Sequence, residues 1–359
     1  MMKPPSPSPT DELLVLRLAG PRWSSSLEQQ LRGLEPGGIV LAGPLPSSPE
    51  TLFELLGKVT RCLAAPPILA LEAEGGGVDP LKALLPPLPS PRALGQKGAR
   101  FVRQAGELVG EALKLLGFNT DFGVVLDFPS GFAAESLGAG TFSADPRVVA
   151  ECGGLFVEGL SRHKILACAK HFPGLGGVTP VPGGELPVCG RSMAELWRAN
   201  LIPYRQLLPR FPLVLMSAAA YTAYDFDYPR SAVLSPQVVE GLLRAKLGYR
   251  GVVVAPHLEA QPVRGSLDVG SAAAQSLSAG CDMLLVEGQE SWQAMHRGIE
   301  EAVTSGAIPR EGLEQSLARI HAVKKGLALP KGAFSRKAWG QLARRVEEFN
   351  SGYQEVKRA

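Results

Sequence analysis

The side chains best suited to chemistry in this chain stand at or just after the ends of short apolar runs. They are Glu72, Glu74, Asp127, Lys170, His171, Glu259 and Glu287. Carboxyl groups can attack a substrate or transfer protons, and lysine or histidine can move a proton or hold a polar ligand. We therefore expect the functional site to be built from these residues, because a fold that gathers the ends of the runs would bring them together.

The apolar runs predict parallel strands that are buried on both faces, because they are uniformly apolar rather than alternating. They are Leu13–Leu18, Gly38–Ala42, Pro67–Glu72, Phe122–Asp127, Ile165–Lys170, Pro212–Ser217, Gly251–Ala255 and Asp282–Val286. A helical pattern follows each one. These are Ser25–Leu34, Pro49–Leu63, Gln96–Leu116, Pro146–Arg162, Met193–Leu208, Pro236–Leu247, Val269–Ala279 and Ser291–Thr304. Eight strand–helix units predict an α/β fold of the (β/α)8 barrel type, with a doubly wound open sheet as the rival. In such a barrel the active site forms at the carboxyl ends of the strands.

The predicted domain organisation has three parts. Residues 1–10, rich in proline and serine, are expected to be a disordered tail, and residues 11–330 to form the barrel. Residues 331–359 are expected to be a C-terminal helical extension that packs on the barrel. The helical patterns Arg310–Leu327 and Ser335–Phe349 would lie outside the ring of strands.

Composition narrows the class of protein. The 359 residues are 45% hydrophobic and 20% charged, with a net charge of only +3, so we expect neither nucleic acid nor a membrane as partner. Five cysteines without a Cys-x-x-Cys spacing predict buried free thiols, and we expect no metal and no cofactor. The start lacks the apolar segment of a secretory leader, and the run Phe211–Tyr224 is too short to span a bilayer. These features favour a cytoplasmic protein.

Motifs that recur in one order connect the chain to a known family. They are Glu72–Gly76, Gly140–Pro146, Lys170–Gly174, Leu215–Ala219, Leu234–Val253 and Ala279–Met283. Together they resemble the motifs of the family 3 glycoside hydrolases, in particular the single-domain β-N-acetylglucosaminidases. The resemblance extends from about Gly37 to Glu287 and implies a (β/α)8 barrel that acts on amino-sugar glycosides.

The resemblance also implies where the catalytic groups of the family should be. These enzymes use a carboxylate that attacks the anomeric carbon and a second group that protonates the leaving oxygen. Pro256 occupies the nucleophile position, while Val181 and Gly183 occupy those of the aspartate and histidine that form the acid/base pair. None of the three can perform the family's chemistry. Other family site positions are also changed, and they now hold Glu72, Gly77, Gly140, Leu175 and Ala219.

Three hypotheses follow. The first is a degenerate, non-catalytic family 3 protein that binds amino sugars or cell-wall fragments. In it, Lys170 and His171 contact sugar as the resemblance implies, and Glu72 and Glu259 complete the ligand-binding set. The second is an active hydrolase in which Glu259 or Glu72 replaces the nucleophile, which requires two carboxyl groups about 5–5.5 Å apart. The third is a scaffold or partner-binding protein whose barrel mouth is closed by apolar side chains such as Leu175. The sequence does not indicate a protein partner.

Purely structural roles compete with these functional ones. Lys170 could pair with Asp127 or Glu72 inside the barrel mouth, and His171 could bond to the backbone. Glu74 and Asp127 could hold loops by accepting backbone N–H groups. Glu259 and the lone His257 could be solvated loop residues.

Overall fold

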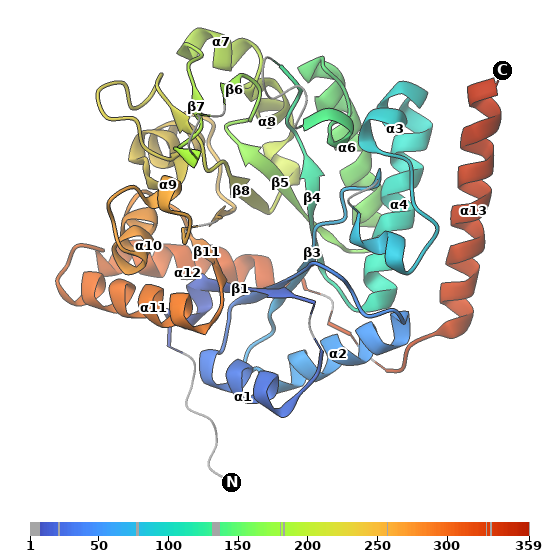
Figure 1. Cartoon of the computed structure of the whole chain (residues 1–359), viewed down its shortest axis with the longest axis horizontal. Helices are drawn as coiled ribbons and strands as arrows, with labels where there is room; N and C mark the ends of the chain where they lie inside the picture. The colour runs from blue at the N-terminus through green and yellow to red at the C-terminus, as the bar shows by residue number, and fades with distance from the viewer. Residues whose placement is uncertain are drawn as a thin grey trace.

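Eight parallel strands close into a barrel (Figure 1). The computed structural model describes residues 8–20, 22–76, 79–130, 137–179, 181, 184–256, 258–327, 329–330 and 332–358. The barrel strands are β1 (Leu14–Ala19), β2 (Gly38–Ala42), β3 (Ile68–Leu71), β4 (Thr120–Val125), β5 (Leu166–Phe172), β8 (Leu213–Met216), β10 (Val252–Ala255) and β11 (Met283–Glu287). Their order around the barrel is β1-β11-β10-β8-β5-β4-β3-β2, with Leu14 beside Leu284 where the first and last strands meet. The predicted (β/α)8 barrel is confirmed, and the open sheet is wrong.

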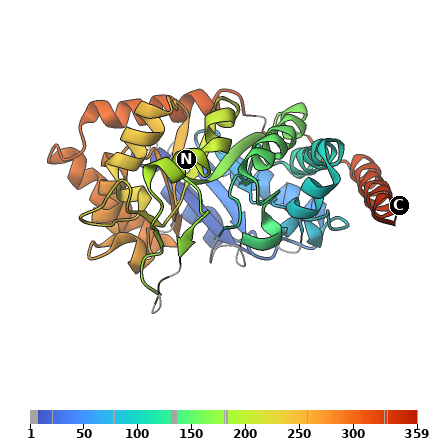
Figure 2. The ribbon, with the colours of Figure 1, turned by 90° about the horizontal axis from the view of Figure 1, so that it is seen from above.

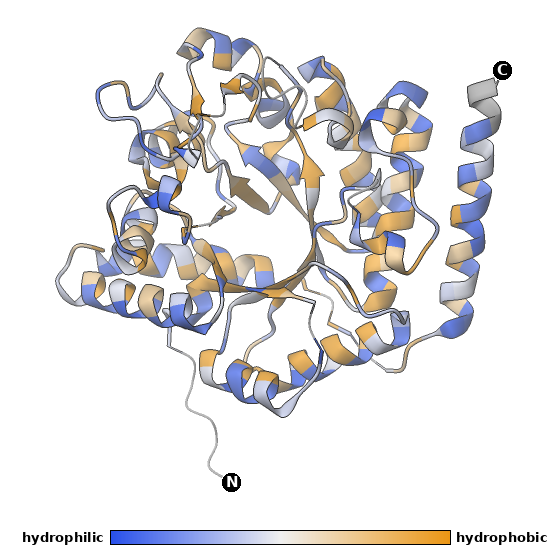
Figure 3. Ribbon diagram, viewed as in Figure 1, coloured by the Kyte–Doolittle hydropathy of each residue, from blue (hydrophilic) through white to orange (hydrophobic). Residues whose placement is uncertain are grey.

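A ring of helices covers the barrel. It includes α1 (Ser25–Leu34), α2 (Pro49–Cys62), α4 (Ala99–Leu116), α6 (Pro146–Arg162), α8 (Leu201–Leu207), η8 (Gln237–Lys246), α10 (Val269–Ser278), α11 (Gln289–Thr304) and α12 (Arg310–Lys324). Their apolar stripes turn toward the strands, which Figure 3 shows as two-coloured helices around an orange barrel. Side-chain caps start several of them: Ser24 accepts from Leu27 N, and Asp145 accepts from Arg147 N.

Two predicted helices are divided in the structure. The pattern Gln96–Leu116 is interrupted at Gly98, whose φ of 95° ends α3 (Pro91–Lys97) before α4 begins. The pattern Met193–Leu208 becomes α7 (Met193–Arg198) and α8, with Asn200 at the break. The Asn200 amide donates to the carbonyls of Gly174 and Gly176 at 3.0 and 2.9 Å. The break therefore anchors the loop that follows β5.

A small sheet that the sequence did not predict stands beside the barrel mouth. It contains β6 (Val178–Thr179), β7 (Val188–Cys189) and β9 (Ala220–Tyr221), in the order β6-β7-β9. Figure 2 shows the yellow-green β6 and β7 segments projecting from the barrel toward the lower edge of the view. The Tyr221 hydroxyl donates to Gly174 O at 2.8 Å, which ties this sheet to the loop after β5.

A charged network closes the opposite end of the barrel, where the strands begin. Asp282, just before β11, accepts from Arg244 Nη2 at 2.6 Å, Arg319 Nη2 at 2.7 Å and Ser316 Oγ at 2.8 Å. It also accepts from the backbone N–H of Val253 at 2.8 Å. One buried carboxylate thus joins β10, β11, η8 and α12.

The last helix, α13 (Arg336–Arg358), lies outside this ring and packs on α4. The rings of Phe101 and Phe349 are 5.7 Å apart, and Arg345 pairs with Glu111.

The proposed division into domains stays a prediction. All five cysteines are buried free thiols. None of the described helices is both long and apolar enough to cross a bilayer.

Candidate functional site

A cavity of about 230 Å³ opens at the barrel mouth, where the strands end. Its lining residues are Arg17, Glu72, His171, Leu175, Val178, Pro187, Leu215, Met216, Ala218, Ala219, Pro256 and Leu285. Polar groups come from β1, the end of β3 and β5, and the remaining wall is apolar. The volume is below the roughly 300–1,000 Å³ of drug-sized pockets, so it suits a ligand of about one sugar ring. Leu175 lines this cavity without filling it.

Lys170, near the end of β5, holds two carboxylates together. Its side chain is 2% exposed, and Nζ lies 3.1 Å from Glu72 Oε2 and 2.5 Å from Glu74 Oε1. Burial alone would lower the pKa of this ammonium, but the two carboxylates outweigh it and raise the pKa above its ordinary value. The predicted pairing with Glu72 is confirmed, and the second partner is Glu74 rather than Asp127.

The same contact decides the charge of Glu72. Burial would raise the pKa of its carboxyl group, but the charge of Lys170 and its hydrogen bond lower the pKa below the usual value. Glu72 is therefore ionised near neutral pH. An ionised carboxylate can accept hydrogen bonds from a ligand, whereas it cannot serve as a general acid.

Asp127 holds the loop after β5 and orients His171. Its Oδ1 accepts from Leu175 N at 2.7 Å, and its Oδ2 accepts from His171 N at 3.3 Å. His171 Nδ1 lies 2.8 Å from the same Oδ2. The backbone role predicted for Asp127 is confirmed. The predicted bond from His171 to the backbone is wrong, because its ring contacts a carboxylate through Nδ1. Among the described residues Nε2 has no hydrogen-bond partner, so it is the ring nitrogen that can meet a ligand.

Asp121 supports the segment that carries Glu72 and Glu74. It lies within β4, is fully buried, and accepts from the backbone N–H groups of Ala73 at 3.1 Å and Gly123 at 2.8 Å. Its Oδ2 has no hydrogen-bond partner in the described part of the chain. Burial raises the pKa of this carboxyl to about 8. Its place directly before the apolar run that begins at Phe122 was the signal that could have revealed it.

Glu259 lies beside the cavity wall rather than in it. Its Oε1 accepts from the backbone N–H of Glu287 at 2.7 Å, and the side chain of Glu287 pairs with Arg17 Nη1 at 2.5 Å. Arg17, which sequence reasoning did not single out, is the residue of this group that lines the cavity. Through Glu287, the Glu259 carboxylate is connected to Arg17 and so to the cavity wall.

The positions that the sequence resemblance assigns to the family's catalytic groups are only partly described by the structure. Pro256, which the sequence resemblance assigns to the family's nucleophile position, lines the cavity. Val181 is described and half-buried, whereas Gly183, His257 and Gly77 lie outside the described residues. Among the described residues, no three His, Cys, Asp or Glu side chains form a group that could hold a metal ion.

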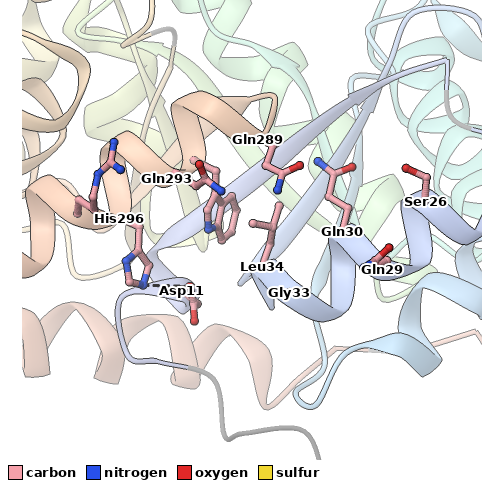
Figure 4. Close-up of a pocket in the computed structure, with 11 residues that line it drawn as sticks. Asp11, Ser26, Gln29, Gln30, Gly33, Leu34, Gln289, Gln293 and His296 are labelled. Atoms are coloured by element: carbon pink, nitrogen blue, oxygen red, sulfur yellow. Dashed lines mark ion pairs between the residues drawn. The ribbon is translucent and has the colours of Figure 1, made fainter.

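A larger groove of about 860 Å³ lies on the outer surface between α1 and α11 (Figure 4). Amides dominate its labelled lining: Gln29 and Gln30 come from α1, and Gln289 and Gln293 from α11. Its carboxylate, Asp11, lies 3.4 Å from His296 Nε2. This groove lies outside the barrel and its carboxylate is paired. We therefore take the mouth cavity, and not this groove, as the candidate functional site.

Comparison with known proteins agrees with this geometry. The chain matches the Glycosyl hydrolase family 3 N terminal domain over residues 13–323 and belongs to glycoside hydrolase family 3. A beta-hexosaminidase of Bordetella avium (strain 197N) is 31% identical over 292 residues, which cover 79% of this chain and 81% of the relative. One from Nitrosomonas eutropha (strain DSM 101675 / C91 / Nm57) is 29% identical over 280 residues, covering 76% and 80%.

A solved structure shows the same architecture. It is a family 3 beta-N-acetylglucosaminidase from Paenibacillus sp. str. FPU-7, with 27% identity and a TM-score of 0.84. The match covers 95% of this chain and 68% of that one. The family resemblance drawn from the sequence is confirmed.

Proposed function

We propose that this protein binds an amino sugar, or a fragment of an amino-sugar glycan, at the barrel mouth and does not hydrolyse it by the family's mechanism. The observation that carries the proposal is the wall of the cavity, where Pro256, assigned by resemblance to the nucleophile position, lines the same space as Glu72 and His171. The names of the relatives, beta-hexosaminidase and beta-N-acetylglucosaminidase, support the class of ligand.

The argument against hydrolysis rests on the nucleophile. A retaining mechanism needs a carboxylate that forms a glycosyl ester, and proline has no group that can do so. Loss of a covalent nucleophile costs on the order of 10⁶ in rate. In the described part of the chain, Glu72 is the carboxylate that lines the cavity, and it is held by Lys170.

The argument for binding rests on the groups that remain. Glu72 can accept hydrogen bonds from sugar hydroxyls, His171 can use Nε2, and Arg17 can donate. The apolar wall, which includes Leu175 and Met216, can pack against the apolar face of a sugar ring. A polar side opposite an apolar side matches the two-faced surface of a saccharide.

A second candidate function keeps the hydrolase active through Glu72. One observation favours it: Glu72 is ionised and faces the cavity, as a nucleophile must. It still needs a proton donor, and His171, oriented by Asp127, is the group in reach of the same cavity.

Two measurements on the whole chain separate these functions. Calorimetry should detect N-acetylglucosamine binding, weakened at least tenfold in Glu72→Gln and unchanged in Glu185→Gln, an exposed carboxylate on the loop after β5. An aryl β-N-acetylglucosaminide should remain intact. Absence of binding at millimolar sugar would contradict the proposal, and hydrolysis that disappears in Glu72→Gln would establish the second function instead.

A further inference from the structure

A second cleft lies on the mouth side of the barrel, between the loops that follow β1 and β2. It has a volume of about 610 Å³. Arg22 and Trp23 reach it from the loop after β1, Pro44 and Pro46 from the loop after β2, and Glu54 and Lys58 from α2. None of these residues lines the mouth cavity, so the cleft is a separate space on the same side of the molecule.

The aromatic and cationic groups of this cleft are placed together. Lys58 Nζ lies 5.7 Å from the centroid of the Trp23 ring, which is half-buried. Within the described ranges, neither Arg22 nor Lys58 has a carboxylate partner. By contrast, neighbouring carboxylates are occupied: Glu28 pairs with Arg32, and Glu50 pairs with Arg336. Two cations and one carboxylate, Glu54, therefore face this cleft, which leaves an excess of one positive charge.

We propose that this cleft binds a sugar that carries an anionic group, either a carboxylate or a phosphate. Arg22 and Lys58 would bind the anion, since a guanidinium matches carboxylate and phosphate oxygens and an ammonium adds a point charge. Trp23 and the two prolines would pack against the ring, and Glu54 accepts hydrogen bonds from its hydroxyls. A neutral sugar would leave the excess positive charge of the cleft uncompensated, and a bare anion would leave the apolar wall unused.

The volume agrees with this class of ligand. About 610 Å³ lies within the range of pockets that enclose small organic molecules, and it exceeds the mouth cavity. The site is independent of the proposed function, because its residues belong to other loops than those of the mouth cavity. A ligand could occupy it whether or not the mouth is filled.

The test is calorimetric titration of the whole chain with glucose 6-phosphate and with glucuronic acid, each compared with glucose and with inorganic phosphate. We expect at least one anionic sugar to bind at least tenfold more tightly than glucose and than phosphate, and its affinity to fall with added salt. The better of the two anionic sugars identifies the charged group. Equal binding of glucose, equal binding of phosphate, or no binding of either anionic sugar would overturn the proposal.

The structure provides a matched control for the lysine. Lys246 lies 4.8 Å from the centroid of the Trp197 ring on another face, so Lys246→Gln removes a similar cation from a similar ring. We expect Lys58→Gln and Arg22→Gln each to weaken the anionic sugar at least tenfold, and Lys246→Gln to have no effect. Because Arg22 is exposed, Arg22→Gln keeps the test valid if Lys58→Gln impairs folding. Equal affinities in wild type and in both cleft variants would refute the assignment.

A second titration separates this proposal from the one for the mouth. Glu72→Gln should leave the anionic sugar's affinity unchanged, and Lys58→Gln should leave N-acetylglucosamine binding unchanged. If Glu72→Gln abolished anionic sugar binding, the ligand would occupy the mouth and the cleft assignment would be wrong.

Discussion

Both ends of the barrel bury charge, but they leave it in different states. At the closed end, Asp282 is 0% exposed, and Arg244, Arg319 and Ser316 occupy both of its oxygens. At the mouth, Lys170 is equally buried, yet its partners are 34% and 22% exposed. A buried charge whose hydrogen-bonding atoms are all occupied holds the surrounding elements in place. The partly exposed carboxylates at the mouth still contact solvent, so a ligand can replace the water bound to them.

The largest effect is expected from breaking the closed end. Asp282→Asn would leave Arg244 and Arg319 without their carboxylate in a buried place, which typically costs about 3–5 kcal/mol. Urea unfolding followed by circular dichroism measures the change. Glu28→Gln, which opens an exposed pair on α1, serves as the control and should cost less than about 0.5 kcal/mol. A loss below about 1 kcal/mol for Asp282→Asn would contradict the claim that the ion pairs of Asp282 stabilise the fold.

The matching change at the mouth should lower the free energy of unfolding by a smaller amount. Lys170→Met leaves Glu72 and Glu74 unpaired, but water can reach both, so we expect a loss of about 2 kcal/mol and a large loss of sugar binding. The lowered pKa of Glu72 contributes stability that is present above its unfolded pKa of about 4.3 and is lost as the pH falls through the folded value. The difference between wild type and variant should therefore shrink in unfolding curves below about pH 4. A constant difference from pH 3 to 7 would contradict the ion pair's contribution.

A third change should stabilise the mouth. Burial raises the pKa of Asp121 to about 8, so the folded state holds its proton more tightly than the unfolded state does. Its contribution to stability therefore falls as the pH rises from about 4 to 8. Asp121→Asn keeps an oxygen for Ala73 N and Gly123 N, and at pH 8 it should be more stable than wild type by at least about 1.4 kcal/mol, the value of one pK unit. Thermal unfolding at pH 5 and pH 8 measures this, and an advantage that does not grow with pH would show that Asp121 titrates normally.

The smallest effect is expected at Glu259. Glu259→Ala removes the acceptor for Glu287 N, a partly exposed contact, and should cost no more than about 1 kcal/mol. Sugar affinity should fall less than threefold, because Arg17 and not Glu259 lines the cavity. Glu259→Gln keeps an acceptor oxygen for Glu287 N, and its sugar affinity should also fall less than threefold. A large loss of binding in both variants would restore Glu259 to the ligand-binding set.

The sequence predicted the barrel well because its strands are buried on both faces. Runs such as Val252–Ala255 are apolar throughout, and that pattern is local. The breaks at Gly98 and Asn200 were missed because they depend on a glycine conformation and on carbonyls far along the chain. Helix propensity alone could not predict either of these two breaks.

The site was predicted in part for the same reason. Lys170, His171 and Glu72 follow recognisable motifs, and the structure brings all three to the mouth. Arg17 escaped notice because its partner, Glu287, is 270 residues away. Glu259 was assigned to the ligand because it lies three residues past Pro256, the expected nucleophile position, but its carboxylate bonds to the chain itself. The four ligand-binding assignments remain predictions.

The meeting of the first and last strands has a consequence for how the protein is made. Arg17 leaves the ribosome long before Glu287 does. The edge of β1 that pairs with β11 therefore stays unpaired until most of the chain has been synthesised. The contact between Arg17 and Glu287 can form only when the barrel closes. A nascent chain that stops short of β11 therefore lacks Leu285 in the wall of the mouth cavity, and this cavity can be completed only after β11 has been made.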